Sequence, residues 1–278
     1  MVGAMLTEPV ESGSHAGLVF MHAHGYAPMS GHGVIGVTAI ARARALIVTA
    51  GGDGSLVFDT VAGAIRAELR PGGGPTSAGE GMLVRFANVP SFVLRGGLPI
   101  VIGSRTIRVD VAYGGVFYAI VDAESVGLGV DGRHLPALGR MAAGLIERVE
   151  AAMVVAHPSE PSVKGLGGVL FTGPAADARA QLRSVTVLAG GSTGRSASGT
   201  GLSAVLAVLD AMGLVANEGE IEQEGISGAR FKATMARRTQ IGEYRAIVPF
   251  VEGSAWITGE HRFYADPSDP FDRGFSLE

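Results

Sequence analysis

Met29-Ser30-Gly31-His32-Gly33-Val34-Ile35-Gly36 matches a second stretch of the chain in register, Ala197-Ser198-Gly199-Thr200-Gly201-Leu202-Ser203-Ala204. Each copy is a Ser-Gly-x-Gly element that leads from a predicted strand into an Ala-rich predicted helix. A single Ser-Gly-x-Gly is often only a turn with a serine helix cap. Two copies in the same context, one in each half of the chain, favour an internal repeat. The sequence therefore predicts two similar units.

The remaining elements can be predicted outward from these segments. Apolar periodicity predicts helices over residues 34–46, 135–152 and 202–212, the second with Pro136 suited to a first helical turn. Short β-type runs, separated by Gly-rich turns, predict strands near residues 17–21, 45–49, 54–58, 82–89, 106–111, 113–121, 168–171 and 184–188. The fold class is α+β, with mostly antiparallel sheet and a few long helices.

Composition excludes several classes of protein. The 278 residues are 47% hydrophobic and 17% charged, which suits a folded core, and the net charge of −4 comes without a basic stripe for nucleic acid. No apolar run is long enough to span a bilayer, so we expect no membrane partner. The first residues lack the basic and apolar regions of a signal peptide, and cysteine is absent. We expect a cytoplasmic protein without disulfides or thiolate metal sites.

The repeat also predicts a site. Each element leaves backbone N–H groups free at the positive end of a helix, which suits a carboxylate, and glycine lets the main chain approach a ligand closely. If the two units face each other, Ser30 and Ser198 flank a small anionic substrate. Gly31, His32, Gly199 and Thr200 are then the candidate substrate-binding residues. This geometry suits removal of a proton from one face of a carbon and delivery of a proton to the other.

Residues 17–33 and 194–201 resemble the two active-site segments of the proline racemase superfamily. The resemblance continues at 109–119 and at 266–275, and so covers nearly the whole chain. It implies a fold like that of diaminopimelate epimerase, with two pseudo-symmetric units, each a curved, mainly antiparallel sheet around a central helix. We expect these units at residues 1–111 and 112–260, with a tail at 261–278 that returns to the first. The resemblance implies no cofactor, no metal and a small cyclic amino acid as substrate, and it leaves a homodimer open.

Within the family, the motifs are more similar to trans-3-hydroxy-L-proline dehydratases than to racemases or epimerases. Phe20-Met21-His22, Gly114-Gly115-Val116-Phe117-Tyr118 and His157-Pro158-Ser159-Glu160 carry this similarity. The implied activity is cofactor-independent dehydration through abstraction of the α-proton. Racemisation or epimerisation of proline or hydroxyproline, and a degenerate relative without catalysis, stay open as alternatives.

Three features depart from the family pattern. Ser30 and Ser198 stand where racemases have cysteines, and a serine hydroxyl needs a partner base, for which His32 and His24 are the candidates. Gly194 stands where relatives have an aspartate that binds the ring nitrogen of the substrate. Met1 aligns with a segment that relatives reach some way into their chains, so we expect an N-terminal segment to be missing. A base on one face suffices for elimination, whereas racemisation needs one on each face, so the serine pair favours dehydration.

Two other kinds of site are not favoured. His22 and His24 alternate on a predicted strand like a metal-binding pair, but no third ligand accompanies them, and we expect no metal. Gly199-Thr200-Gly201 resembles a phosphate-binding turn, but neither a P-loop lysine nor a GxGxxG after a strand is present.

Overall fold

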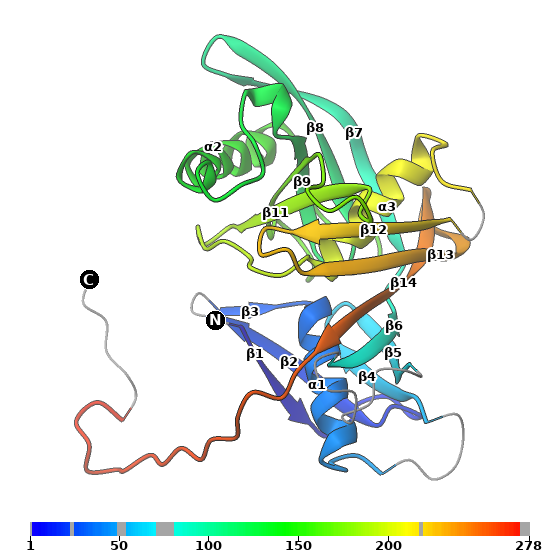
Figure 1. Ribbon diagram of the computed structural model, residues 1–278, viewed down its shortest axis with the longest axis vertical. Helices are drawn as coiled ribbons and strands as arrows, with labels where there is room; N and C mark the ends of the chain where they lie inside the picture. Colours follow the sequence, from blue (N-terminus) through cyan, green and yellow to red (C-terminus); the bar gives the residue numbers. More distant parts are fainter. Residues whose placement is uncertain (1, 23–24, 49–53, 71–80, 217–218, 273–278) are drawn as a thin grey trace.

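The computed structural model describes residues 2–22, 25–48, 54–70, 81–216 and 219–272. Two units are stacked one above the other along the long axis of the molecule (Figure 1). The structure is mainly antiparallel β-sheet with three α-helices, α1 (Gly31–Ala43), α2 (Leu135–Ala152) and α3 (Gly199–Ala211), in the described residues. The predicted α+β class is confirmed at this level, and the pseudo-symmetry of the two units stays a prediction.

The first unit is an open sheet packed on α1. Its strands run in the order β1 (Val2–Thr7), β2 (Ala16–His22), β4 (Leu56–Thr60), β5 (Gly63–Leu69), β6 (Met82–Ala87) and the end of β14 (Tyr244–Ala255), and β3 (Gly25–Ala27) pairs with β2. Only the β2–β4 pair is parallel among these described pairings. Helix α1 contacts β5, β6 and β14, so its N-terminus lies near the strands that lead to the second unit.

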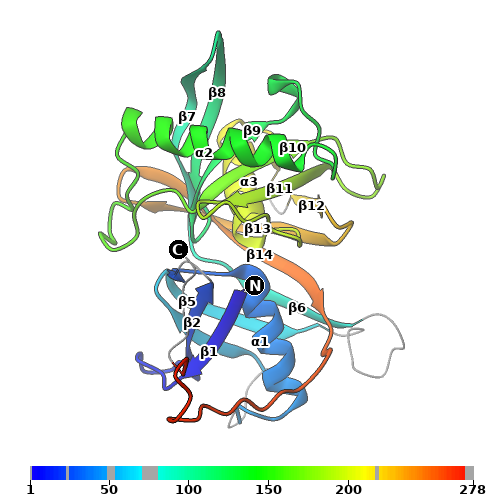
Figure 2. The same ribbon diagram turned by 90° about the vertical axis from the view of Figure 1, so that its left-hand side faces the viewer.

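The second unit is a closed barrel. Its strands are β7 (Ser91–Ile102), β8 (Arg105–Tyr113), β9 (Phe117–Asp122), β10 (Gly168–Gly173), β11 (Leu182–Leu188), β12 (Glu220–Gly225), β13 (Arg230–Ile241) and β14. Pairing of Ala246 in β14 with Phe92 in β7 closes the ring. The short 3₁₀ helix η1 (Glu124–Val126) follows β9, and α2 lies outside the barrel across β9, β10 and β11 (Figure 2).

Helix α3 lies in the barrel because its sequence is apolar on every side. Residues 199–207 are all buried, and α3 contacts β7, β8, β9, β13 and β14. A helix without a polar face must be covered on all sides. By contrast, α2 buries the single stripe Leu138, Ala142, Leu145 and Val149. The barrel therefore fixes the N-terminus of α3.

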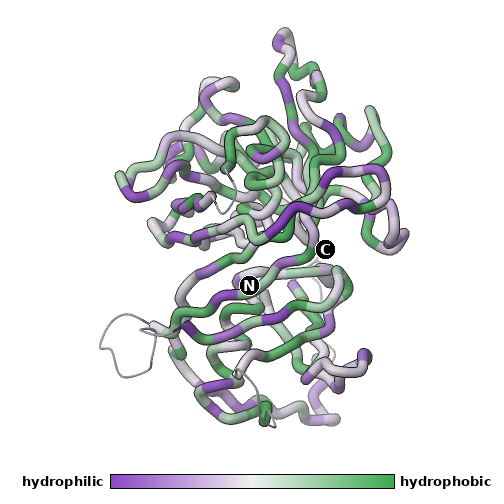
Figure 3. The backbone as a smooth tube through the Cα atoms, turned by 90° about the vertical axis from the view of Figure 1, so that its right-hand side faces the viewer, coloured by the Kyte–Doolittle hydropathy of each residue, from purple (hydrophilic) through white to green (hydrophobic). Residues whose placement is uncertain are grey.

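Two chain segments connect the units, the link from β6 to β7 and strand β14 (Figure 3). They are tied together where Asn88 N–H donates to the Pro249 carbonyl oxygen at 2.8 Å. After β14 the chain continues as an exposed extended segment that runs out to the side of the first unit (Figure 1), and Glu260 forms an ion pair of 3.1 Å with Arg44.

The sequence predictions have mixed outcomes. The helix predicted over 135–152 is confirmed, whereas the other two begin three residues earlier than predicted, directly after their serine caps. The strand predicted at 45–49 is wrong over its described residues 45–48, because the chain turns there and Ala45 has a φ of 48°. The boundary predicted between residues 111 and 112 falls inside β8. None of the described helices combines the length and apolar character needed to cross a membrane.

Candidate active site

The two Ser-Gly-x-Gly segments form the N-terminal caps of α1 and α3. Ser30 and Ser198 both have extended backbone, and each hydroxyl oxygen accepts a hydrogen bond from the N–H three residues later, at 3.3 Å from Gly33 and 3.0 Å from Gly201. This is the cap geometry expected of serine before a helix. The caps hold both side chains at the positive helix ends, as the repeat predicts.

The two helix ends meet through their first residues. A Cβ atom added to Gly31 would lie 2.9 Å from the Cα of Gly199, and one added to Gly199 would lie 3.2 Å from the Cα of Gly31. The Phe86 ring supports both positions from β6. Because neither residue has a side chain, segments 168 positions apart come into backbone contact. The structure thus brings together the two predicted halves of the site.

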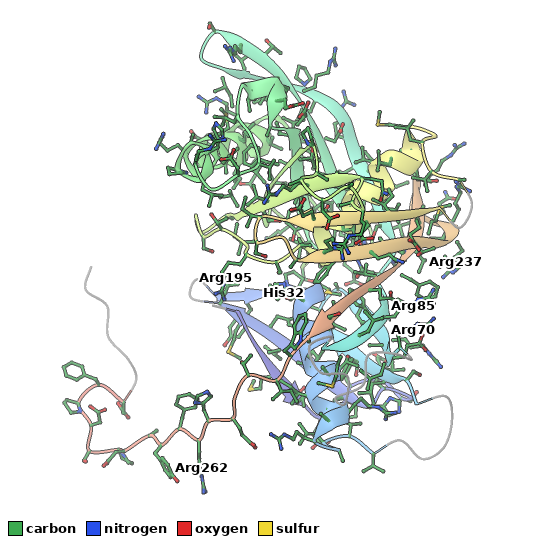
Figure 4. All side chains as sticks on the ribbon, viewed as in Figure 1. His32, Arg70, Arg85, Arg195, Arg237 and Arg262 are labelled. Carbon is green, nitrogen blue, oxygen red and sulfur yellow. The ribbon has the colours of Figure 1, made fainter. Side chains whose placement is uncertain are left out.

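Ser30 has a basic partner. Its Oγ lies 3.4 Å from Nε2 of His32, and Ser30 itself is only 7% exposed. Partial desolvation lowers the pKa of His32 below its ordinary value, which favours the neutral imidazole. His32 and Arg195 both lie at the boundary between the two units (Figure 4). A neutral imidazole beside the hydroxyl can accept its proton, whereas the other candidate partner, His24, lies outside the described residues.

Ser198 has a different environment, made of hydroxyl groups. Its Oγ lies 3.3 Å from Oγ1 of Thr200, which in turn lies 2.8 Å from the hydroxyl of Tyr118 on β9. Burial raises the pKa of Tyr118, so the phenol stays protonated. The two serines therefore differ chemically, although their caps have the same geometry.

Tyr118 and Asn88 contribute to the site, although no pattern in the sequence predicted this. Asn88 donates from Nδ2 to the Gly114 carbonyl at 2.9 Å and to Ser203 Oγ at 2.7 Å, and Ser203 Oγ donates to the Gly199 carbonyl at 2.9 Å. This chain of bonds ties the connection between the units to the first turn of α3. A polar asparagine near the end of the strand predicted over 82–89 was the available signal, but nothing local in the sequence identifies its partners.

The predicted anion site has the required free donors. No described residue accepts a hydrogen bond from the backbone N–H of Gly31, His32, Gly199 or Thr200, as expected for the first positions of a helix. The Gly194 N–H donates to the carbonyl of Thr186 on β11 at 2.8 Å. The roles assigned to these residues stay predictions. Within the described ranges, His, Asp and Glu side chains form no group of three suited to a metal ion.

The hollows found elsewhere on the surface are separate from this site. One of about 240 Å³ is lined by Arg70, Arg85, Glu220, Lys232, Thr234, Phe250 and Glu252. In Figure 4, Arg70 and Arg85 lie on the opposite side of the molecule from Arg195. This hollow mixes acids and bases that already form ion pairs, such as Lys232 with Glu220 at 3.0 Å. Arg85 lies over the Phe250 ring, 3.8 Å from its centroid, so most of the charges that line this hollow already have a partner.

Known proteins resemble this chain over its full length. It is 37% identical over 278 residues to a trans-3-hydroxy-L-proline dehydratase of Bacillus cereus, a match that covers 100% of this chain and 81% of the relative. It is 33% identical to a 4-hydroxyproline 2-epimerase of Streptosporangium roseum, over 100% of this chain and 82% of that protein. The crystal structure of a hydroxyproline epimerase from Agrobacterium vitis with bound trans-4-hydroxy-L-proline superposes with a TM-score of 0.88 at 28% identity, covering 99% of this chain and 77% of that one. The proline racemase family model matches residues 1–276, and the chain belongs to the proline racemase family.

Proposed function

We propose that this chain dehydrates trans-3-hydroxy-L-proline or a similar cyclic 3-hydroxy amino acid. One observation carries the proposal: the two serines at the helix ends have unlike partners, an imidazole for Ser30 and a chain of hydroxyls for Ser198. Elimination needs a base on one face of the substrate and only a neutral donor for the leaving hydroxyl. The asymmetry matches that requirement.

The substrate carboxylate binds to the free N–H groups at the two helix ends. Helix N-termini stabilise negative charge, and this charge grows on the carboxylate as the α-proton leaves. Ser30, with His32 as its proton acceptor, removes that proton. The bond between C3 and its oxygen breaks, the electron pair stays on oxygen, and the Ser198 hydroxyl supplies the proton that completes a water molecule.

The resulting C2=C3 enamine becomes a cyclic imine when the N–H proton moves to C3. The net change is the loss of one water molecule from the substrate. His32 returns its proton through solvent and Ser198 regains one, so the protein ends in its starting state. No oxidant, reductant or cofactor is needed for this balance.

Epimerisation is the second candidate, supported by the similarity to the 4-hydroxyproline 2-epimerase. It needs a group on each face that alternates between base and acid. Ser198 is 3.3 Å from Thr200 and has no described imidazole in hydrogen-bond contact, so it is a poor base. The structure is therefore better suited to elimination than to inversion.

The test is incubation with trans-3-hydroxy-L-proline and detection of the cyclic imine with o-aminobenzaldehyde. Wild type should produce imine, and Ser30→Ala should lower the rate by about 10²-fold or more, as expected for loss of a general base. Chiral chromatography on L-proline and 4-hydroxyproline measures the competing reaction. Inversion without imine formation would replace the proposal by the epimerase, and neither reaction would indicate a degenerate relative.

Binding gives a readout that does not require turnover. Pyrrole-2-carboxylate, a planar mimic of the deprotonated intermediate, should bind between the helix ends and shift the amide resonances of Gly31, His32, Gly199 and Thr200. No chemical-shift or calorimetric response at millimolar concentration would contradict a functional carboxylate site.

A further inference from the structure

Tyr118 carries a buried hydroxyl that has no role in the proton transfers of the proposed reaction. Its side chain is 4% exposed and packs with Ala112, Ile120, Leu170, Ala204 and Val205 between the barrel wall and α3. A buried phenol needs a hydrogen-bond partner, and Tyr118 has one in Thr200, at 2.8 Å between the oxygens. Thr200 is itself 3% exposed, so water has little access to this bond.

The acidity of the groups favours one direction for the hydrogen bonds. A phenol is more acidic than an alcohol, so Tyr118 is the better donor and the Thr200 oxygen accepts. The hydrogen of Thr200 then points to Ser198 Oγ, 3.3 Å away. Ser198 Oγ already accepts a hydrogen bond from the Gly201 N–H at 3.0 Å.

Both acceptor positions of the Ser198 oxygen are therefore occupied. A hydroxyl has two lone pairs and one hydrogen. With both lone pairs engaged, the only free group of Ser198 is its hydrogen, which is left for the substrate. On the other side, Ser30 lies beside a ring nitrogen that can take its hydrogen, so Ser30 can act as a base.

We infer that Tyr118 is a positioning residue that acts through Thr200 to hold the Ser198 hydroxyl as a hydrogen donor to the substrate. The inference rests on the proposed function, because it assigns the donor for the leaving hydroxyl. It also explains why Tyr118 stands on β9, where the strand passes the first turn of α3.

The first experiment compares Tyr118→Phe with Tyr113→Phe as a matched control. Tyr113 is an equally buried tyrosine on the neighbouring strand β8, and its ring packs against Phe92 and Phe117 at centroid distances of 5.4 and 4.9 Å. Tyr118→Phe should lower kcat for imine formation about tenfold with little change in KM. This loss is smaller than the full contribution of a general acid, because the Ser198 hydroxyl itself remains in place. Tyr113→Phe should leave both constants unchanged. Thermal unfolding of the two variants separates a folding defect from loss of positioning.

A double-mutant cycle tests whether Tyr118 acts through Ser198. Because the tyrosine has no effect without the serine hydroxyl, Tyr118→Phe combined with Ser198→Ala should be no slower than Ser198→Ala alone. Thr200→Val should reproduce the loss in Tyr118→Phe, and Thr200→Ser should be faster than Thr200→Val because it restores the hydroxyl. Multiplicative effects of the two single variants would overturn the inference.

A second readout does not depend on turnover. The proton NMR resonance of the Tyr118 hydroxyl, assigned by its absence in Tyr118→Phe, should shift in Thr200→Val and also in Ser198→Ala. If wild type makes no imine, the proposed function fails while this shift still supports the hydrogen-bonded chain. A resonance unchanged in both variants would overturn the inference whatever reaction the protein catalyses.

Discussion

Gly31 and Gly199 lie in backbone contact, with room for no side chain between them: a Cβ on Gly31 would lie 2.9 Å from the Cα of Gly199. They are the first residues of α1 and α3, and each follows a serine cap. Their contact brings the positive ends of two helices from different units to one point. Two such ends repel each other, and a carboxylate bound between them would offset this repulsion.

A methyl group at this contact should force the helix ends apart. We expect Gly31→Ala to lower the free energy of unfolding by about 1–3 kcal/mol, the usual cost of overpacking, and to abolish binding of pyrrole-2-carboxylate. Urea unfolding and calorimetry measure the two effects. The control is Gly36→Ala in the same helix, where an added Cβ meets nothing within 4 Å. That control should gain about 0.5–1 kcal/mol from helix propensity, and equal stability of both variants would contradict the predicted contact.

Cysteine at the two caps should separate the roles of the serines. Ser30→Cys places a thiol at a helix N-terminus beside His32, where the pKa of a thiol falls and more thiolate forms. We expect dehydration to accelerate about tenfold or more, within the range of general-base catalysis. Ser198→Cys should accelerate it less, because that position donates a proton. A larger gain for Ser198→Cys in the imine assay would reverse the assignment of base and acid.

His32 should determine the acid limb of the pH–rate profile. Desolvation lowers its pKa below 6.5, so the imidazole stays neutral at pH values where an ordinary histidine is half protonated. Activity that needs neutral His32 should persist below pH 6.5 and fall only as pH drops through the lowered pKa. The measurement is kcat/KM against pH for wild type, His32→Asn and the control His261→Asn, an exposed histidine near the C-terminus. Retention of the same acid limb in His32→Asn would assign the limb to another group.

Local signals in the sequence predicted the helices better than the contacts between them. The serine caps and the apolar runs behind them predicted α1 and α3, and Pro136 helped to predict all of α2. The partners of these elements are non-local: Tyr118 reaches Thr200 across 82 positions, and Asn88 reaches Ser203 across 115. The closure of the barrel depends on β14 pairing with both β7 and β6, and no periodicity in either segment encodes that choice. The candidate serines could thus be predicted, whereas the hydroxyl chain behind Ser198 required the fold.

Gly194 should accept an aspartate and, with it, bind the substrate more tightly. A Cβ added there would lie 3.5 Å from the Thr186 carbonyl oxygen and 3.6 Å from the Thr186 Cβ, which is ordinary contact. The backbone of Gly194 does not have a positive φ, so a side chain at this position causes no backbone strain.

The carboxylate of Gly194→Asp would face a substrate whose ring amine is cationic. A hydrogen bond between charged partners contributes about 1.5–3 kcal/mol, so KM should fall about tenfold or more while kcat changes little. Gly194→Asn, with the same shape and no charge, should leave KM near the wild-type value. Steady-state kinetics on trans-3-hydroxy-L-proline measure this difference, and raised salt should reduce it by screening. An equal effect of aspartate and asparagine would mean that position 194 acts through packing and lies away from the ring nitrogen.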